Sequence, residues 1–222
     1  MKRAIVLALS VILALVVAAP IASGQSSSQG QNLGKLTGDW WNWAVSTNPS
    51  PLNGGDPCGG NFVDGVFLLG GSFTNDPVTR TCTVPANTPI LFPVVNYACG
   101  AAPTVLDPET GTFTGDPKPY NKCAQDFLDQ IVLNSTTFAT LNGQPLEIQR
   151  LESGPFTFTV PSPDGSEIVP NAPPGSYKSW ASGFWVYLPQ GLEPGTYTLH
   201  WGGTFPNVGF EQDITYNLTV VD

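Results

Sequence analysis

The segment LEPGTYTLHW, residues 192–201, decides the fold class of this chain. After its Pro-Gly turn, the apolar residues Tyr197, Leu199 and Trp201 alternate with polar ones. A strict period of two indicates a strand with one buried and one exposed face. A tyrosine at this place often anchors a corner in β-sandwiches, so the segment predicts a sandwich strand.

Similar signals recur along the chain. DITYNLTVV (213–221) alternates in the same way, and we expect it to pair with 196–201 as a hairpin or near neighbour. VFLL (66–69) and GFWVYL (183–188) are apolar on both faces, which is typical of buried strands.

Two local signals mark irregular positions. Pro93 interrupts the apolar run ILFPVVN and predicts a sheet edge or a bulge, because proline cannot donate to the ladder. The dipeptide Asn142-Gly143 predicts a tight hairpin turn.

Two segments have helical spacing instead. We predict one short helix over about 40–46, capped by Asp39, and a second over about 121–133, capped by Asn121. With many short strands, numerous Pro/Gly turns and only two helices, the chain is predicted to be mainly β. The expected fold is an antiparallel β-sandwich or jelly-roll-like single domain over residues 33–222.

The N-terminus predicts export. Lys2 and Arg3 precede an apolar run that ends in small residues, so residues 1–24 have the layout of a cleaved signal peptide. Residues 25–32 (QSSSQGQN) are predicted to be a flexible leader. The run is short for a membrane span, and we expect a secreted protein without a span in its mature form.

The charge balance restricts the partners. Loss of Lys2 and Arg3 with the signal peptide lowers the net charge from −9 to about −11. Such an acidic surface repels phosphate backbones, so we do not expect a nucleic-acid partner.

The four cysteines, Cys58, Cys82, Cys99 and Cys123, predict two disulfides in an exported chain. Three pairings are possible. We favour Cys58–Cys82 and Cys99–Cys123 because local pairing has the lower closure entropy. A zinc site is disfavoured, since no CxxC occurs and the only histidine is His200.

The tryptophan-rich stretch GDWWNWAVST (38–47) raises the question of a binding surface. Helical spacing places Trp40 and Trp43 on the apolar face and Trp41 roughly opposite. We therefore expect Trp40 and Trp43 to cover the core, and only Trp41 remains a candidate for an exposed contact.

No catalytic motif is recognisable, and we assign no catalytic residue. The function expected is a secreted, non-enzymatic extracellular binding or cell-envelope module, with a polysaccharide or another cell-surface component as partner. Carbohydrate rings stack on aromatic faces, so the predicted contact residues are aromatic. They are Trp41, Trp180, Trp185 and Tyr187.

Other functions remain open. One alternative is a secreted hydrolase for glycosides or esters that uses paired carboxylates. Another is a self-assembling extracellular subunit that exchanges strands, with the leader as the donor segment.

Two further kinds of site are expected from the sequence. Asp107, Glu109 and Asp116 lie in a glycine-containing loop and are candidate Ca²⁺ ligands; no other cofactor is expected. Asn134 and Asn217 begin Asn-x-Thr sequons and are candidate glycosylation sites.

Several quoted blocks together resemble a family of exported prokaryotic β-sandwich proteins of unknown function. The blocks are WWNWAVS, RTCTVPANTPILFPVVN, PGTYTLHWGG and DITYNLTV. The resemblance covers nearly all of the mature chain. It implies export and one domain of conserved length, and no activity or cofactor follows from it.

Overall fold

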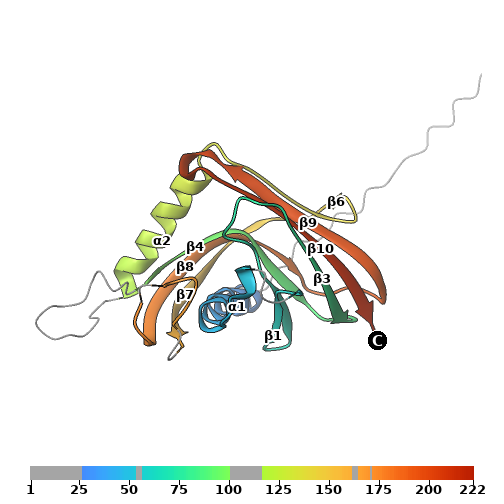
Figure 1. The fold of residues 1–222 in the computed structure, drawn as a ribbon, viewed down its shortest axis with the longest axis horizontal. Helices are drawn as coiled ribbons and strands as arrows, with labels where there is room; N and C mark the ends of the chain where they lie inside the picture. Colours follow the sequence, from blue (N-terminus) through green and yellow to red (C-terminus); the bar gives the residue numbers. More distant parts are fainter. Residues whose placement is uncertain (1–26, 54–56, 101–116, 162–164, 171) are drawn as a thin grey trace, which may run out of the picture.

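The computed structural model describes residues 27–53, 57–100, 117–161, 165–170 and 172–222. They form two five-stranded sheets and two α-helices (Figure 1), which confirms the predicted β-sandwich. Sheet A, in spatial order, consists of β1 (Gly60–Val63), β2 (Val66–Leu69), β4 (Ile90–Gly100), β8 (Gly175–Leu188) and β7 (Gln149–Val160). Sheet B consists of β3 (Val78–Pro85), β10 (Phe210–Val221), β9 (Gly195–Phe205), β5 (Thr136–Leu141) and β6 (Gln144–Pro145). The helices are α1 (Ser27–Ser46) and α2 (Pro117–Val132), with short 3-10 turns η1 (Pro51–Asn53) and η3 (Pro206–Val208).

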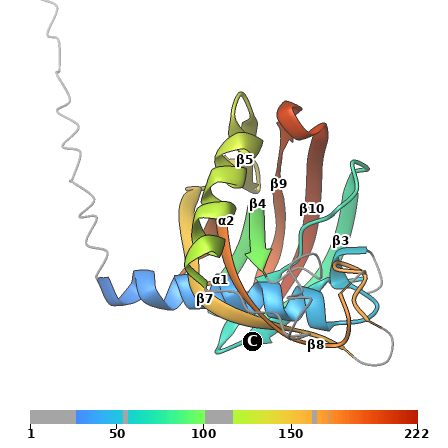
Figure 2. The same ribbon diagram turned by 90° about the vertical axis from the view of Figure 1, so that its left-hand side faces the viewer.

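Sheet A is the middle layer of the molecule. α1 crosses one of its faces, and sheet B and α2 cover the other, as Figures 1 and 2 show. Leu68 and Leu91 pack toward α1, whereas Phe67 and Phe92 pack toward sheet B. Because both faces of sheet A are covered, its central strands are apolar on both sides, as the sequence predicts.

The pairing of β9 with β10 confirms the expected hairpin. The two strands are antiparallel and are joined through η3, with Trp201 opposite Ile214. Tyr197 also forms the expected corner, because its hydroxyl donates to the carbonyl oxygen of Glu193 at 3.1 Å. Asn142 and Gly143, with φ of 50° and 77°, form the turn between β5 and β6.

The sandwich is mainly antiparallel, as predicted, and it also contains parallel strand pairs. β2 pairs in parallel with β4, and β3 pairs in parallel with β10. The chain leaves sheet A after β2, runs through β3 in sheet B and returns as β4. Such a crossover is what parallel neighbours need, since a tight hairpin joins only antiparallel strands.

Pro93 lies at a bulge, as predicted. The register between β4 and β8 shifts between Pro93 and Val95. On its other side, β4 pairs with β2 only at Ile90 and Leu91, so the proline lies where β4 has no second neighbour in the sheet.

The first helix is longer than predicted, and Asp39 is not its cap. α1 begins at Ser27, so residues 27–32 of the predicted flexible leader are helical. Gly34 and Gly38 argue against a helix on propensity alone. Here they allow close packing against β7, because a Cβ at Gly34 would lie 2.5 Å from the carbonyl oxygen of Glu152.

The second helix also starts earlier than predicted. α2 begins at Pro117, so Asn121 lies inside the helix and does not cap it. Proline is well tolerated in the first helical turn, where its missing N–H has no intrahelical partner. The apolar residues Leu128 and Ile131 pack on Val95 and Phe205, as the predicted helix face requires.

Both disulfides are present with the pairing that we favoured. Cys58–Cys82 ties the segment before β1 to β3, and Cys99–Cys123 ties β4 to α2. None of the helices in the described part of the chain is long and apolar enough to cross a membrane. The predicted signal peptide lies outside the described residues, as do residues 25 and 26 of the leader.

Candidate functional site

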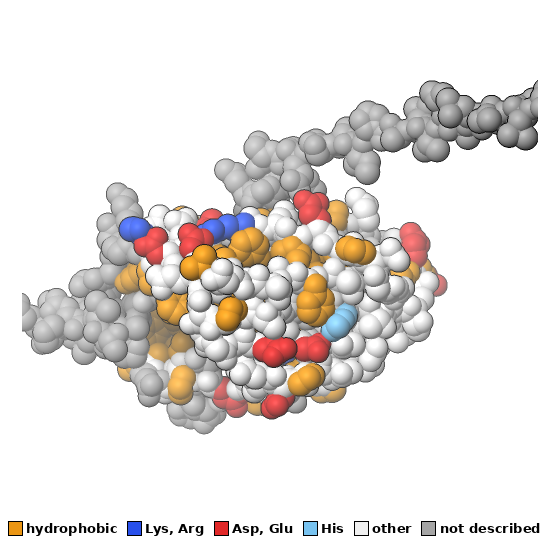
Figure 3. Space-filling view, turned by 90° about the horizontal axis from the view of Figure 1, so that it is seen from above, with side chains coloured by type: hydrophobic (Ala, Val, Ile, Leu, Met, Phe, Trp, Pro, Cys, Tyr) orange, Lys and Arg blue, Asp and Glu red, His pale blue; other side chains and the backbone are white. Residues whose placement is uncertain are grey.

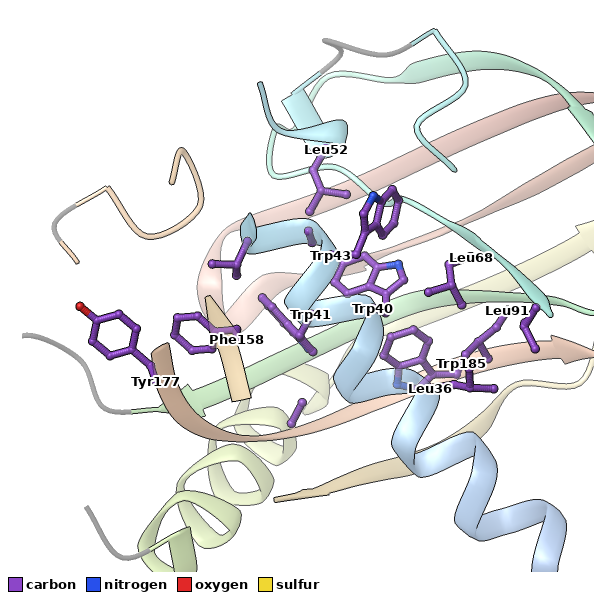
Figure 4. Close-up of a cluster of buried hydrophobic side chains, with 14 of the residues drawn as sticks. Leu36, Trp40, Trp41, Trp43, Leu52, Leu68, Leu91, Phe158, Tyr177 and Trp185 are labelled. Carbon is purple, nitrogen blue, oxygen red and sulfur yellow. The ribbon is translucent and has the colours of Figure 1, made fainter. Parts of the chain in front are cut away.

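All three tryptophans of the GDWWNWAVST stretch are buried, so the prediction of an exposed Trp41 is wrong. Trp40, Trp41 and Trp43 have exposed fractions of 1%, 8% and 9%. Figure 4 shows Trp40 between Trp43 and Trp185. Trp41 belongs to the same buried cluster as Phe158, Val160 and Tyr177. β7 lies along this side of α1, because Gly38 packs against Phe156 and the Asn42 side chain accepts from the Thr159 N–H at 3.0 Å. Helical periodicity identifies one buried face and cannot reveal that other segments cover the rest of the helix.

The other predicted contact residues are separated. Trp185 is completely buried and meets Trp40 edge to face, with ring centroids 5.6 Å apart. Trp180 is half-buried, and its indole N–H donates to Glu152 at 3.0 Å. Tyr187 is half-buried on the α1 side of sheet A. Trp180 lies on the opposite face by the alternation of β8, so the four aromatic residues do not form one site.

The surroundings of Trp180 form an ion-paired network instead of an open cleft. Glu152 also accepts from the Ser182 hydroxyl at 2.6 Å, and its second neighbour is Arg150 at 3.5 Å. Arg150 in turn pairs with Asp129 of α2 at 2.5 Å. These contacts join β7, β8 and α2, and they give hydrogen-bond or ion-pair partners to the polar groups around the Trp180 indole.

A pocket of about 370 Å³ lies beside Tyr187. Its walls come from α1, from the β1–β2 turn, from the residue preceding β4 and from β8. The lining residues are Lys35, Leu36, Asp64, Gly65, Val66, Pro89 and Tyr187. Pockets of this size hold small ligands, and we refer to it as the Tyr187 pocket.

The polar side of the Tyr187 pocket is an ion triad. Lys35 Nζ lies 2.7 Å from Asp39 and 2.7 Å from Asp64. Asp64 and Gly65 have φ of 48° and 79°, so the two-residue β1–β2 turn places the carboxylate above α1. Lys35 and Asp64 keep exposed side-chain fractions of 62% and 65%, so both remain accessible to a ligand.

The pKa values follow from these contacts. The hydrogen bonds that Lys35 donates to Asp39 and then to Asp64 raise its pKa above the ordinary value, so the ammonium is charged at neutral pH. Burial raises the pKa of the Tyr187 phenol, which is therefore neutral. Its hydroxyl makes no hydrogen bond to any described residue, so the group is available as a donor and acceptor.

Lys35 and Asp64 are residues that our sequence reading missed. The Asp64-Gly65 dipeptide between two apolar stretches is a hairpin signal, and it could have located the turn. Nothing in the sequence places that turn against the first half of α1, because the two segments meet only through packing.

The outer face of sheet B is mostly polar. Figure 3 shows the molecule from the side of α2 and sheet B, with apolar side chains scattered among polar ones. His200 lies on this face and pairs with Asp213 at 2.8 Å, while Phe138 meets its ring edge-on. Asn217 is exposed on the same face, and Asn134 is exposed after α2, so both sequon asparagines are accessible.

The described ranges contain no group of three His, Cys, Asp or Glu side chains that could hold a metal ion. The predicted Ca²⁺ ligands Asp107, Glu109 and Asp116 lie outside these ranges.

No protein-family model matches this chain. No curated protein and no solved structure matches it either. The Tyr187 pocket is therefore interpreted from its own chemistry.

Proposed function

We propose that this protein is an extracellular carbohydrate-binding module and that the Tyr187 pocket holds a sugar residue. The observation that carries the proposal is the placement of Tyr187 beside the accessible Lys35–Asp64 pair. An aromatic ring offers an apolar face to the C–H side of a sugar. The adjacent charged pair offers a donor and an acceptor to its hydroxyls.

The hydrogen-bonding capacity of the ion pair supports this ligand class. An ammonium has three N–H donors, and Lys35 uses two of them on Asp39 and Asp64. Asp64 accepts the lysine bond through Oδ2, and Oδ1 makes no hydrogen bond within the described ranges. One donor and one acceptor therefore remain side by side, which suits two neighbouring hydroxyls of a sugar ring.

Two disulfides are consistent with an oxidising compartment outside the cytosol. Cleavage after residue 24 is part of the proposal. Mass spectrometry of the exported protein tests it, and a mature N-terminus at Gln25 is expected. Retention of Met1 in the exported protein would contradict it.

A glycan array followed by calorimetry tests the ligand class. The mature protein is screened against soluble and surface-bound polysaccharides, and the best ligand is titrated into four variants. Tyr187→Ala removes the ring and should weaken binding about tenfold. Tyr187→Phe keeps the ring and should have a smaller effect. Lys35→Met and Asp64→Asn should each weaken binding without unfolding the protein, because both side chains are largely exposed.

Phe138→Ala is the matched control. Phe138 is 37% exposed on the far side of the sandwich and has no part in the pocket. Its loss should leave the affinity unchanged. Silence across the whole array, or an equal loss in Phe138→Ala and Tyr187→Ala, would overturn the proposal.

A further inference from the structure

The ion triad beside Tyr187 contains more negative than positive charge. Lys35 Nζ lies 2.7 Å from a carboxylate oxygen of Asp39 and 2.7 Å from one of Asp64. A single ammonium balances only one of the two carboxylates, so the triad has a net charge of about −1 at neutral pH. One negative charge at the edge of the Tyr187 pocket is therefore uncompensated.

The other walls of the pocket do not supply the missing positive charge. Its remaining lining residues are uncharged at neutral pH: Leu36, Gly65, Val66, Pro89 and Tyr187. Among the elements that form the walls, β8 adds Lys178, which lies near the opposite end of that strand from Tyr187. An extended strand separates the two by about 30 Å, well beyond the screening length of about 8 Å at physiological salt.

The uncompensated charge is accessible to a ligand. The side chains of Lys35 and Asp64 are 62% and 65% exposed, and that of Asp39 is 29% exposed. Lys35 donates to the Oδ2 atom of each aspartate. An ionised carboxylate has about four acceptor positions, so Asp64 can accept further hydrogen bonds while it is paired with Lys35.

An acidic ligand that pairs with Lys35 would be the opposite solution. Such a ligand would meet two carboxylates for one ammonium, and the ammonium already donates to both of them. Like charges in close contact are unfavourable, whereas a cation meets the reverse balance and gains a partner. The same sign holds at longer range, because the chain has 17 acidic residues against 8 lysines and arginines.

We infer that the Tyr187 pocket is selective for amino sugars, which carry a protonated amine, over neutral and acidic sugars. This inference rests on the proposed carbohydrate-binding function and names the class of sugar. The sugar ring packs on Tyr187, and its ammonium group donates to Asp64 as a charge-assisted hydrogen bond. Amines of this kind are protonated below about pH 7.

Three oligosaccharides of equal length and β-1,4 linkage test the selectivity. Glucosamine and glucose oligomers differ only at C2, where an ammonium replaces a hydroxyl, and a mannuronate oligomer supplies the acidic probe. Each is titrated calorimetrically into the mature protein at about pH 6. We expect the glucosamine oligomer to bind about three- to fivefold more tightly than the glucose oligomer, and the mannuronate oligomer to bind most weakly. Raising NaCl from about 50 mM to about 500 mM should reduce this difference.

Two substitutions should change the selectivity in opposite directions. Asp64→Asn makes the triad neutral, so the ratio of glucosamine to glucose affinity should fall to about one. Lys35→Met leaves two carboxylates unbalanced, so the ratio should rise above that of the native protein. A general weakening of binding cancels in the ratio, and a purely structural effect would not reverse its direction.

Asp126→Asn is the matched control for these substitutions. Asp126 pairs with Lys122 at 2.6 Å across one turn of α2, as Asp39 does with Lys35 on α1, and it does not line the pocket. Its neutralisation should leave the ratio unchanged. Thermal unfolding checks that all three variants are folded.

The outcomes separate this inference from the proposed function. Equal affinities for the glucosamine and glucose oligomers, or tightest binding of the mannuronate oligomer, would overturn the selectivity and leave carbohydrate binding standing. An unchanged ratio in both Asp64→Asn and Lys35→Met would overturn the role assigned to the ion triad. No binding of the glucosamine oligomer would overturn the inference, and silence of the whole glycan array would overturn the proposed function as well.

Discussion

The indole N–H of Trp40 donates a 2.8 Å hydrogen bond to the carbonyl oxygen of Leu69, the last residue of β2. This bond joins α1 to sheet A at the centre of a cluster in which Trp40 meets Trp41, Trp43 and Trp185 edge to face. It also satisfies a buried carbonyl at the point where the chain leaves the sheet.

Trp40→Phe should therefore destabilise the protein beyond the loss of ring volume. The substitution leaves the Leu69 carbonyl unpaired and opens a cavity, and together these cost about 2–4 kcal/mol. Urea denaturation measures the change. Trp43→Phe is the control, because its indole N–H makes no hydrogen bond within the described residues, and the loss should be clearly smaller. Equal losses would show that the Trp40–Leu69 bond contributes little.

Gly34→Ala should destabilise the protein although alanine favours helices. On propensity alone the change would stabilise α1 by about 1 kcal/mol. The new Cβ would lie 2.5 Å from the carbonyl oxygen of Glu152, which is backbone and cannot turn away. Overpacking of this kind costs about 1–3 kcal/mol, so a net loss is expected in a denaturation experiment.

Gly38→Ala is a useful comparison for Gly34→Ala. Its Cβ would lie 2.9 Å from the Cβ of Phe156, which is a less severe approach than the 2.5 Å at Gly34. We expect a smaller loss than at Gly34. A gain in stability at Gly34 would contradict the close α1–β7 contact.

Arg80→Met should be among the most damaging single substitutions. Arg80 is 4% exposed and donates to four backbone carbonyls and to the Tyr216 hydroxyl. Loss of the guanidinium leaves these buried acceptors short of donors, and we expect more than about 3 kcal/mol of destabilisation. Chemical denaturation gives the value.

Arg150→Met serves as the control for Arg80. Arg150 is 36% exposed and pairs with Asp129 and Glu152. Pairs that are accessible to solvent contribute little, so its loss should cost no more than about 1 kcal/mol. Similar costs for the two arginines would contradict the role assigned to Arg80.

The two disulfides offer a matched pair of substitutions. Each joins cysteines that are 24 residues apart, so chain entropy predicts the same stabilisation, about 3 kcal/mol, for both. Replacing each pair by serines and measuring unfolding should give equal losses on this account. A larger loss for Cys58–Cys82 would indicate that its bridge also supports the Arg80 region through contacts in the folded state.

Stability should fall as the pH rises above about 10. Burial raises the pKa of Tyr177 and of Tyr187, and carboxylate hydrogen bonds raise that of Lys35. Each group therefore holds its proton more tightly in the folded state than in the unfolded state. The resulting stabilisation is complete below the unfolded pKa values and is lost as the pH rises through the folded ones.

Urea midpoints measured between about pH 8 and pH 11 check this dependence. Tyr187→Phe and Lys35→Met should each flatten the decline slightly, since each removes one contributing group. A urea midpoint that stays constant or rises over this pH interval would contradict the raised pKa values of these three groups.

The periodicity of single segments was enough to predict β9 and β10. Alternation around Tyr197 and Tyr216 places Leu199, Trp201 and Ile214 inside, and the structure buries them. The bulge in β4 was predictable from Pro93, because proline lacks the backbone N–H that a regular sheet ladder needs. The disulfides were also predictable from the sequence, since each joins two consecutive cysteines that are 24 residues apart.

Only the tertiary structure decided which segments cover the surface of α1. Trp41 lies off the predicted helix face and is nevertheless buried, because segments more than a hundred residues away pack on that side of α1. Gly34 and Gly38 lie within a helix because β7 approaches them closely, and this contact outweighs their poor propensity.

The sequence by itself determined that this chain forms short strands, two helices and two local disulfides, because these depend on neighbouring residues. It did not determine the Tyr187 pocket. Lys35, Asp64 and Tyr187 are far apart in the chain. Their meeting depends on the order of strands in sheet A and on the path of α1 across it, and only the folded chain fixes these.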